Sequence, residues 1–407
     1  MRKRVLLVLP TRSYRAAAFL AAAQRLSLEV AIASEEGSTL SHLHPDQEVV
    51  IDFADPAAAV AVATELATRN PFQAVIPADE AGVLVAAHIA EQLGLRSSPL
   101  KAVAATRNKL VLRERLQEAG VSQPRWGLWI EGDSPPPVEF PAVVKPLDQA
   151  ASRGVIRVED PKQLLAAGRR VRSMLRTDPK CATPANSVSL LVEEFVAGPE
   201  VAVDALLVAG ATRLLAIYDK PDPLDGPFFE ETIYTVPTAL APARQAKVLA
   251  ALERVVRTLG LSEGAIHAEL RLGGDQAALI DIASRSIGGR CSRVLHFRSG
   301  RSLEEILLLA ALGEDPGELE LESRARGVMM LPIPKSGTLR SVSGREAVLA
   351  MPGVDQVEVT VPVGGRVVSW PEGDRYLGFI FASGPDPASV AGELRLAYGK
   401  LGLLIQD

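Results

Sequence analysis

Two carboxylates, Glu269 and Asp281, lie in alternating apolar runs that are separated by the turn residues 273–275. Such a pattern is typical of a β-hairpin, and a turn centred on residue 275 places Glu269 directly across from Asp281. Carboxylates at that spacing repel each other, so the pair favours a bound cation, and its oxygen ligands suit Mg²⁺ better than Zn²⁺. For the hairpin alone, an ordinary solvated sheet face with alternating charges is the competing interpretation.

Other polar side chains share the strand faces of these carboxylates, because successive side chains of a strand point to opposite faces. His267 and Arg271 accompany the first carboxylate, and Ala283 and Arg285 accompany the second. His267 is expected to support the site or the substrate rather than to act as a general base.

A glycine pair, Gly288 and Gly289, follows the hairpin and precedes Arg290. The backbone N–H groups of such a pair can form a nest or a helix start that holds a substrate carboxylate, and Arg290 could serve the same anion. A tight turn is the competing interpretation. Cys291 is expected to pack as a small hydrophobic side chain.

Two lysines and a loop of small residues lie upstream and could bind an anion. Lys109 lies near the start of a predicted helix, where a cation opposes the helix dipole, and such a local misfit can mark function. Lys145 closes a predicted strand. The loop 148–154 follows it, and the N–H groups around Ser152 and Gly154 could fold over an anionic ligand, although most such loops are only turns.

Residues 1 to about 100 alternate short apolar runs with helical patterns, beginning with the run 5–9. This rhythm predicts a parallel β-sheet with helices on its faces. No GxGxxG motif follows the first run, so a dinucleotide site is not expected there. Four side chains at strand ends are weak candidates for substrate contacts, with capping and solvation favoured: Thr11, Arg12, Asp79 and Glu80.

The rest of the chain reads as mixed helices and strands. One helix is predicted over 106–120, and alternating runs near the C-terminus predict an α+β region. Gly364 and Gly365 mark a predicted hairpin turn between the runs 354–363 and 366–370.

The composition describes a globular protein of two to four domains, since 47% of its 407 residues are hydrophobic and 23% are charged. The first apolar run is too short for a signal peptide or a membrane span, so a cytoplasmic protein is expected. Cys181 and Cys291 lack zinc-site or disulfide spacing, and free thiols are expected. A net charge of −5 without a basic block predicts no nucleic-acid partner.

Several features follow one another in a recognisable order: Lys145, the small-residue loop, an acidic pair at 193–194 that ends a strand, and Glu200 just beyond a Gly-Pro turn. With Lys109 and the hairpin, they resemble the nucleotide site of the ATP-grasp superfamily. In that family two lysines contact phosphate, a loop covers it, a strand end binds adenine and a glutamate holds the ribose. The matching residues are Lys109, Lys145, Ser152, Gly154, Glu193, Glu194, Phe195, Val196 and Glu200.

The hairpin matches the metal-binding strands of the same superfamily. By position, Glu269 and Asp281 match its two magnesium carboxylates, and Arg285 matches the arginine of an ExxxR motif. Many ATP-grasp enzymes have ExNxR there, with the asparagine on the metal, whereas this chain has Ala283. The form without asparagine resembles that of the L-amino acid ligases.

The segment DKPDPLDGPFFEETIYTVPT, residues 219–238, resembles the substrate loop of dipeptide-forming L-amino acid ligases. A glutamate and, three residues later, a histidine contact the substrate in that loop. Glu231 takes the position of the glutamate, but Tyr234 takes that of the histidine. A neutral phenol cannot act as a cation near a developing oxyanion, so this position departs from the family pattern.

The resemblance implies an ATP-grasp fold made of α/β and α+β domains. Residues 1–105 would form a Rossmann-like pre-ATP-grasp domain. Residues 106–310 would form the nucleotide-binding core, with subdomains that meet near residue 190. Residues 311–407 would form an α+β lid or support.

The resemblance also implies an ATP-dependent carboxylate–amine ligase that forms an amide or peptide bond through an acyl phosphate and releases ADP and phosphate. Its expected cofactors are ATP and Mg²⁺, with Mn²⁺ as an alternative, its partners are a small carboxylate and a small amine, and its assembly could be a homodimer. The alternatives are bicarbonate-dependent carboxylation, a purine-pathway ligation, or nucleotide binding without catalysis. Catalytic roles would fall to Arg285 and Glu231, and substrate contacts to Tyr234, Gly288, Gly289, His267 and Arg290.

Overall fold

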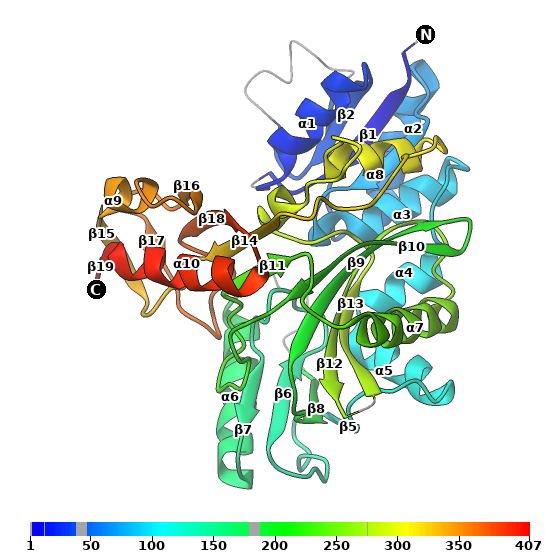
Figure 1. The fold of residues 1–407 in the computed structure, drawn as a ribbon. Helices are drawn as coiled ribbons and strands as arrows, with labels where there is room; N and C mark the ends of the chain where they lie inside the picture. The colour runs from blue at the N-terminus through cyan, green and yellow to red at the C-terminus, as the bar shows by residue number, and fades with distance from the viewer. Residues whose placement is uncertain (1, 12, 38–46, 179–187, 275) are drawn as a thin grey trace.

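The computed structural model describes residues 2–11, 13–37, 47–178, 188–274 and 276–407 (Figure 1). The candidate Arg12, the thiol of Cys181 and the turn residue Asp275 lie outside these ranges. Within them, no helix combines the length and the apolar character that crossing a membrane requires.

The N-terminal region is the predicted parallel sheet, with strand order β3-β2-β1-β4. Every residue of β1 is buried, as expected for a central parallel strand that is covered on both faces. Helices α2 and α3 contact each other, while α1 packs with α8 (Figure 1). The bounds are β1 Arg4–Val8, α1 Ala16–Arg25, β2 Glu29–Ser34, β3 Glu48–Val50, α2 Pro56–Arg69, β4 Ala74–Pro77, α3 Val83–Gln92 and α8 Leu303–Ala311.

The helix predicted over 106–120 is shorter than expected. Thr106 ends a separate helix, α4 (Leu100–Thr106), and the next helix, α5, spans Lys109–Glu118. The Asn108 side chain accepts hydrogen bonds from the N–H groups of Leu110 and Val111, so a side-chain cap sets the start of α5. Lys109 is thereby the first residue of its helix.

A four-stranded antiparallel sheet follows, in the order β5-β8-β6-β7, and α6 packs on it. Alternate residues on the helix-facing side form a core with the apolar face of α6. The bounds are β5 Trp126–Trp129, β6 Ala142–Pro146, β7 Ile156–Val158, α6 Pro161–Thr177 and β8 Leu190–Glu194.

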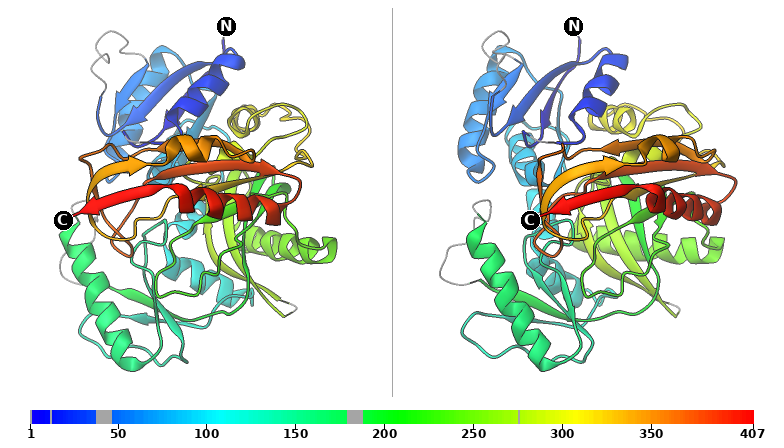
Figure 2. Two further views of the ribbon diagram at one scale, coloured as in Figure 1. Left: turned by 60° about the vertical axis from the view of Figure 1, so that its left-hand side comes forward. Right: turned by 90° about the vertical axis from the view of Figure 1, so that its left-hand side faces the viewer.

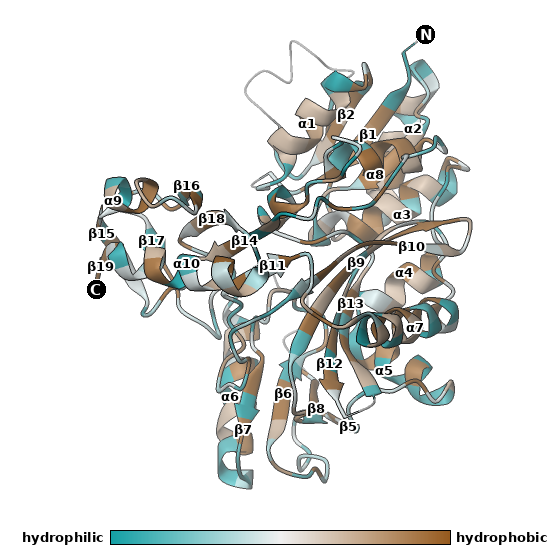
Figure 3. Ribbon diagram, in the orientation of Figure 1, coloured by the Kyte–Doolittle hydropathy of each residue, from teal (hydrophilic) through white to brown (hydrophobic). Residues whose placement is uncertain are grey.

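The largest sheet has eight strands in the order β13-β12-β9-β10-β11-β14-β18-β16. Helix α7 covers part of it with an apolar stripe, and its exposed side is polar (Figure 3). Because β11 pairs with β14, the C-terminal strands extend the sheet of the core. The bounds are β9 Glu200–Val208, β10 Ala211–Asp219, β11 Ile233–Val236, α7 Pro242–Leu259, β12 Gly264–Gly273, β13 Gln276–Ala283, β14 Ala325–Met330, β16 Val354–Val359 and β18 Gly378–Gly384.

A three-stranded sheet, β17-β15-β19, completes the C-terminal region with helices α9 and α10. The predicted hairpin at Gly364 and Gly365 is wrong, because β16 pairs with β18 whereas β17 pairs with β15. The glycines carry the chain from one sheet to the other. In both views of Figure 2 this region, in orange and red, lies between the blue N-terminal sheet and the green helix α6. The bounds are β15 Gly337–Ser343, α9 Arg345–Leu349, β17 Arg366–Val367, α10 Pro387–Lys400 and β19 Gly402–Gln406.

The Gly198-Pro199 turn has a similar role, since β8 and β9 belong to different sheets. Gly198 has φ +118°, and a Cβ atom there would lie 2.5 Å from the carbonyl oxygen of Leu272. We expect Gly198→Ala to lower the free energy of unfolding by about 2–3 kcal/mol, from the strained dihedral together with this clash. Gly210→Ala is the control, because Gly210 also has a positive φ, of +81°, but open space around it. It should cost only about 1 kcal/mol, and equal losses in urea unfolding would contradict the clash.

Candidate active site

A cavity of about 1100 Å³, including its part open to solvent, lies where the four-stranded and eight-stranded sheets meet the end of β4. Most of the predicted site residues line it. These are Lys109, Lys145, Ser152, Glu193, Glu194, Phe195, Val196, Glu200, Glu231, His267, Glu269, Asp281 and Arg285.

The hairpin brings its carboxylates together as predicted, since Glu269 pairs with Asp281 in the β12–β13 ladder. The predicted turn centre was wrong, because Gly273 pairs with Gln276 and the ladder from there would place Glu269 opposite Ile280. A β-bulge at Ile280 absorbs the extra residue and restores the pairing. The Ile280 carbonyl in turn accepts a hydrogen bond of 2.6 Å from the Arg113 guanidinium.

Asp281 lies beside two ammonium groups. Lys109 Nζ is 2.9 Å from Asp281 Oδ2 and also donates to the carbonyl of Gln149. Burial would raise the pKa of Asp281, but Lys109 and Lys145 hold it below its usual value. The predicted phosphate lysine and metal carboxylate thus meet at one point of the cavity.

The second lysine, Lys145, is buried against Glu193. Its Nζ lies 2.6 Å from Glu193 Oε2, and Arg113 Nε lies 2.6 Å from the other carboxylate oxygen. Burial lowers the pKa of Lys145 to about 8, partly offset by Glu193. The side chain of Glu193 therefore positions two cations. One of them, Arg113, lies one turn beyond Lys109 on α5 and was missed by sequence reasoning.

A buried ammonium group, Lys220, lies among three carboxylates that converge from different elements. Its Nζ is 2.7 Å from Glu200, 2.6 Å from Glu231 and 3.3 Å from Glu269. Burial opposes its charge, but these carboxylates raise the pKa of Lys220 well above its usual value. Sequence reasoning gave Lys220 no role, although it directly follows β10 and belongs to the segment that resembles a substrate loop.

The residues that follow β8, Phe195 and Val196, contact the guanidinium group of Arg271. Arg271 Nε donates to Glu200 over 2.8 Å, and its Nη1 donates to the carbonyl of Val196 over 2.9 Å. The Phe195 ring stacks with Phe229, and Arg271 lies over it at 4.7 Å. Arg271 thus joins the predicted hinge to the predicted ribose glutamate, and its place on the strand face of Glu269 was the sequence signal for it.

His267 faces the cavity from a buried pair. Its Nδ1 lies 2.7 Å from Asp204 Oδ1, and its Nε2 lies 4.0 Å from Glu269. Asp204 is fully buried and also accepts hydrogen bonds from the Tyr218 hydroxyl and the Ile287 N–H. This arrangement fixes the orientation of the ring, and the supporting role of His267 stays a prediction.

Tyr234 and Gly154 do not line the cavity. The Tyr234 hydroxyl donates to the carboxylate of Glu231, so it orients the glutamate. The sequence predicted that the N–H of Gly154 would contact a phosphate. It instead donates to the carbonyl of Pro371 over 2.8 Å and is therefore not available to an anion. The Trp370 indole also donates to the carbonyl of Ala151, and the C-terminal region thereby holds the small-residue loop.

The predicted carboxylate nest lies elsewhere. Gly288 and Gly289 precede a short 3₁₀ helix of four residues and do not line the cavity. Arg290 forms an ion pair of 2.6 Å with Glu358 of β16, so its charge supports the C-terminal strands. The tight turn is the interpretation that agrees with these positions. Cys291 is a buried free thiol, and burial raises its pKa well above its usual value.

Of the strand-end candidates in the N-terminal region, Asp79 and Glu80 differ. The Asp79 side chain caps a 3₁₀ turn and accepts a hydrogen bond from Ser13, as favoured from the sequence. Glu80 instead lines the cavity, between Arg107 and Arg285. Burial would raise the pKa of Glu80, but the two guanidinium groups hold it below its usual value.

The donor set at this end of the cavity suits a hard cation. Ligand atoms of Glu200, Glu231 and Glu269 lie within 4.8 Å of one another, and Asp281 faces Glu269. Burial raises the pKa of Glu269, although Lys220, 3.3 Å away, opposes the shift. Carboxylate oxygens are the ligands that Mg²⁺ and Mn²⁺ prefer, so Glu269 and Asp281 could hold such an ion beside the ammonium groups of Lys220 and Lys109.

Glu230, next to Glu231, supports a prediction about pH. Burial raises its pKa from 4.5 to about 7, partly offset by the N–H of Ile333, which donates to its carboxylate. Between these pH values the folded protein holds a proton that the unfolded chain releases, so stability falls as the pH rises. As the pH rises from 4.5 to 7.5, the free energy of unfolding of Glu230→Gln should increase by about 1–2 kcal/mol relative to that of the wild type. A pH-independent difference in urea unfolding would contradict this.

Comparisons with known proteins identify relatives of three parts of the chain. Models of the ATP-grasp N-terminal domain, the ATP-grasp domain and the L-amino acid ligase C-terminal domain 2 match residues 20–96, 138–294 and 329–402. An L-amino acid ligase structure from Bacillus licheniformis superposes with a TM-score of 0.82 at 26% identity, covering 100% of both chains.

Two curated relatives match this chain over only part of their own length. Dapdiamide A synthase of Enterobacter agglomerans is 27% identical over 62% of this chain and 60% of its own. Human carnosine synthase 1 is 32% identical over 53% of this chain but only 26% of its own. The chain thus spans about a quarter of one of these relatives and somewhat under two thirds of the other.

Proposed function

Because this chain belongs to the ATP-grasp superfamily and carries an L-amino acid ligase C-terminal domain, we propose that it is an ADP-forming ligase that joins a small carboxylate to an amine. One substrate would be an amino acid, and the product would be an amide or a dipeptide. The observation that carries the proposal is the meeting of Lys109, Lys145, Glu269, Asp281 and Arg285 around one cavity.

In the proposed reaction, a substrate carboxylate oxygen attacks the γ-phosphorus of ATP, the bond from that phosphorus to the β,γ-bridging oxygen breaks, and ADP leaves while an acyl phosphate forms. Lys109 and Lys145 would neutralise charge on the phosphates, although Lys145 also keeps its contact with Glu193. Mg²⁺ held by Glu269 and Asp281 would supply further charge neutralisation. An amine would then attack the acyl carbon, and phosphate would leave.

Arg285 would stabilise the oxyanion that forms when the amine attacks. Since Tyr234 donates to Glu231, that glutamate is held as an acceptor, which suits a contact with an amine rather than with an anion. In this proposal the phenol takes no direct part, and the departure from the family histidine changes which substrates are accepted.

The test is an incubation with ATP, Mg²⁺ and pooled amino acids, followed by measurement of ADP, phosphate and new amide masses. We expect ADP and phosphate in equal amounts, with an amide product. Formation of AMP and pyrophosphate would rule out the acyl-phosphate route. ADP release that requires bicarbonate would indicate carboxylation, and tight ATP binding without turnover would indicate a purely nucleotide-binding protein.

A cytoplasmic location and a homodimeric assembly are further parts of the proposal. Cell fractionation and light scattering of the purified protein would measure them directly.

A further inference from the structure

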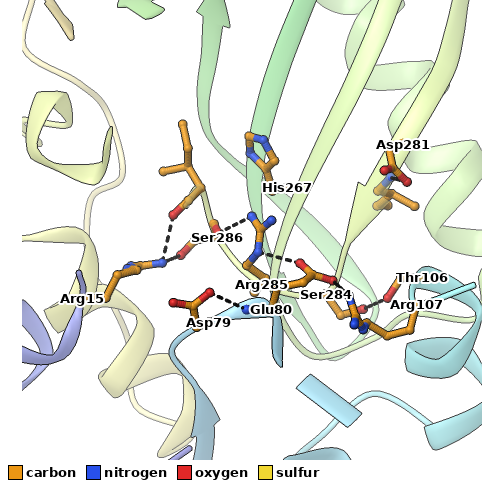
Figure 4. Close-up of polar contacts among 12 residues, drawn as sticks. Arg15, Asp79, Glu80, Thr106, Arg107, His267, Asp281, Ser284, Arg285 and Ser286 are labelled. Atoms are coloured by element: carbon orange, nitrogen blue, oxygen red, sulfur yellow. Dashed lines mark hydrogen bonds and ion pairs between the residues drawn. The ribbon is translucent and has the colours of Figure 1, made fainter. Parts of the chain in front are cut away.

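Glu80 connects the N-terminal region to the arginine that we assign to catalysis. It begins the 3₁₀ turn Glu80–Gly82 that follows β4, and one of its carboxylate oxygens is 2.7 Å from Arg285 Nε (Figure 4). Its other oxygen accepts a hydrogen bond from Arg107, in the connection between α4 and α5. All three side chains are largely buried and line the cavity. The trio keeps a net charge of +1, so it still attracts an anion.

The backbone around Arg285 is held by other contacts. Ser284 shares a hydrogen bond of 3.0 Å with Thr106, which ends α4. On the other side, Arg15 donates to the Ser286 hydroxyl over 2.6 Å and to the carbonyl of Ile287 over 3.0 Å (Figure 4). Because these contacts fix the main chain, the remaining freedom of Arg285 lies in its long side chain.

The guanidinium group is itself restrained at two points. Its Nε forms an ion pair with Glu80, and its Nη1 donates to the carbonyl of Ser286 over 2.9 Å. Within the described part of the chain, Nη2 has no hydrogen bond or ion pair with another protein group. A guanidinium has five N–H donors in one plane, so two fixed points define where the other donors lie.

We propose that Glu80 is a positioning residue that fixes the guanidinium of Arg285 toward the reacting group, and that Arg107 holds Glu80 in place. The inference rests on the proposed function, because it assigns Arg285 to the oxyanion. If Glu80 has this role, the N-terminal region contributes a side chain to the active site in addition to supporting the fold. A misplacement of about 1 Å at such a group can cost a hundredfold in rate.

The first experiment compares Glu80→Gln and Glu80→Asp with Glu263→Gln. Glu263 pairs with Arg96 near the same junction but lies outside the active-site cavity. We expect Glu80→Gln to lower kcat about a hundredfold while the KM for ATP changes less than about threefold. Glu80→Asp should recover part of the rate, and Glu263→Gln should leave the rate unchanged. Thermal unfolding would confirm that each variant folds.

A double-mutant cycle with Arg285→Lys separates positioning from direct substrate binding. Lysine cannot keep the Nε contact, so Glu80→Gln should cost less than about threefold in that background. A full hundredfold loss there would overturn the proposal. So would a Glu80→Gln variant with normal kcat and a raised KM for the amino acid, which would place Glu80 on the substrate.

A readout without turnover keeps this inference distinct from the proposed function. In protein labelled with ¹⁵N-arginine, the Nε–H signal of Arg285 is identified by its disappearance in Arg285→Lys. The ¹⁵Nε chemical shift of this signal should differ between the wild type and Glu80→Gln, because the variant removes the carboxylate charge that lies 2.7 Å from Nε. An unchanged shift would overturn the positioning role, whereas absence of ligation by the wild type would overturn only the proposed function.

Discussion

Replacing Asp281 with asparagine should lower the rate of ADP release between about a hundredfold and a thousandfold. The substitution keeps the shape of the side chain but removes its charge. It thereby weakens the attraction for a divalent cation and leaves the ammonium group of Lys109, 2.9 Å away, without its partner. The carboxylate of Glu269 would remain, so nucleotide binding should be weakened less than turnover.

The measurement is steady-state ADP release over a range of Mg²⁺ concentrations, together with binding of Mn²⁺ followed by electron paramagnetic resonance. Asp315→Asn is the matched control, because the side chain of Asp315 is 84% exposed and does not line the cavity. If Asp281→Asn and Glu269→Gln both left turnover and Mn²⁺ binding unchanged, the metal assignment would be wrong.

Replacing Lys220 with methionine should lower the free energy of unfolding by about 3–5 kcal/mol near pH 7, because it removes one partner of a buried ion cluster. Methionine keeps much of the volume of the lysine chain. The carboxylates of Glu200, Glu231 and Glu269 would then face one another with less compensation. Arg271 would still neutralise part of the charge on Glu200.

The loss should depend on pH in a defined direction. Without the ammonium group, the clustered carboxylates would bind protons more readily in the folded state than in the unfolded chain. Stability of Lys220→Met should therefore fall as the pH rises, so its deficit should be smaller near pH 5 than near pH 8. Urea unfolding of the variant and the wild type at both pH values would measure this.

Two variants sharpen this test. Adding Glu231→Gln to Lys220→Met should restore part of the stability, since it removes one of the uncompensated charges. Lys3→Met is the control for loss of a lysine, because Lys3 pairs with Glu314 at the surface and its side chain is 48% exposed. A loss for Lys220→Met no larger than that of Lys3→Met would show that the cluster does not stabilise the fold.

Sequence patterns succeeded where local spacing carries the information. Strand alternation correctly placed Glu269 across from Asp281, but it missed the bulge at Ile280 that makes the pairing possible. Turn signals failed at Gly364 and Gly365, because a glycine pair permits a reversal without naming the strand that the chain pairs with next. Domain boundaries and the roles of the site residues remain predictions.

The sequence by itself determined the parallel N-terminal sheet, the hairpin with its two carboxylates and the resemblance to an ATP-grasp ligase. The first two depend on periodicity and local spacing, and the third depends on the order in which short motifs follow one another along the chain. Only the tertiary structure decided that Lys220 neutralises three carboxylates, that Glu80 holds Arg285 and that Gly154 binds the C-terminal region. The partners in these contacts are separated by many residues along the chain. Charge and hydrogen bonding act over a few ångströms in space, so their outcome is set by which elements pack together.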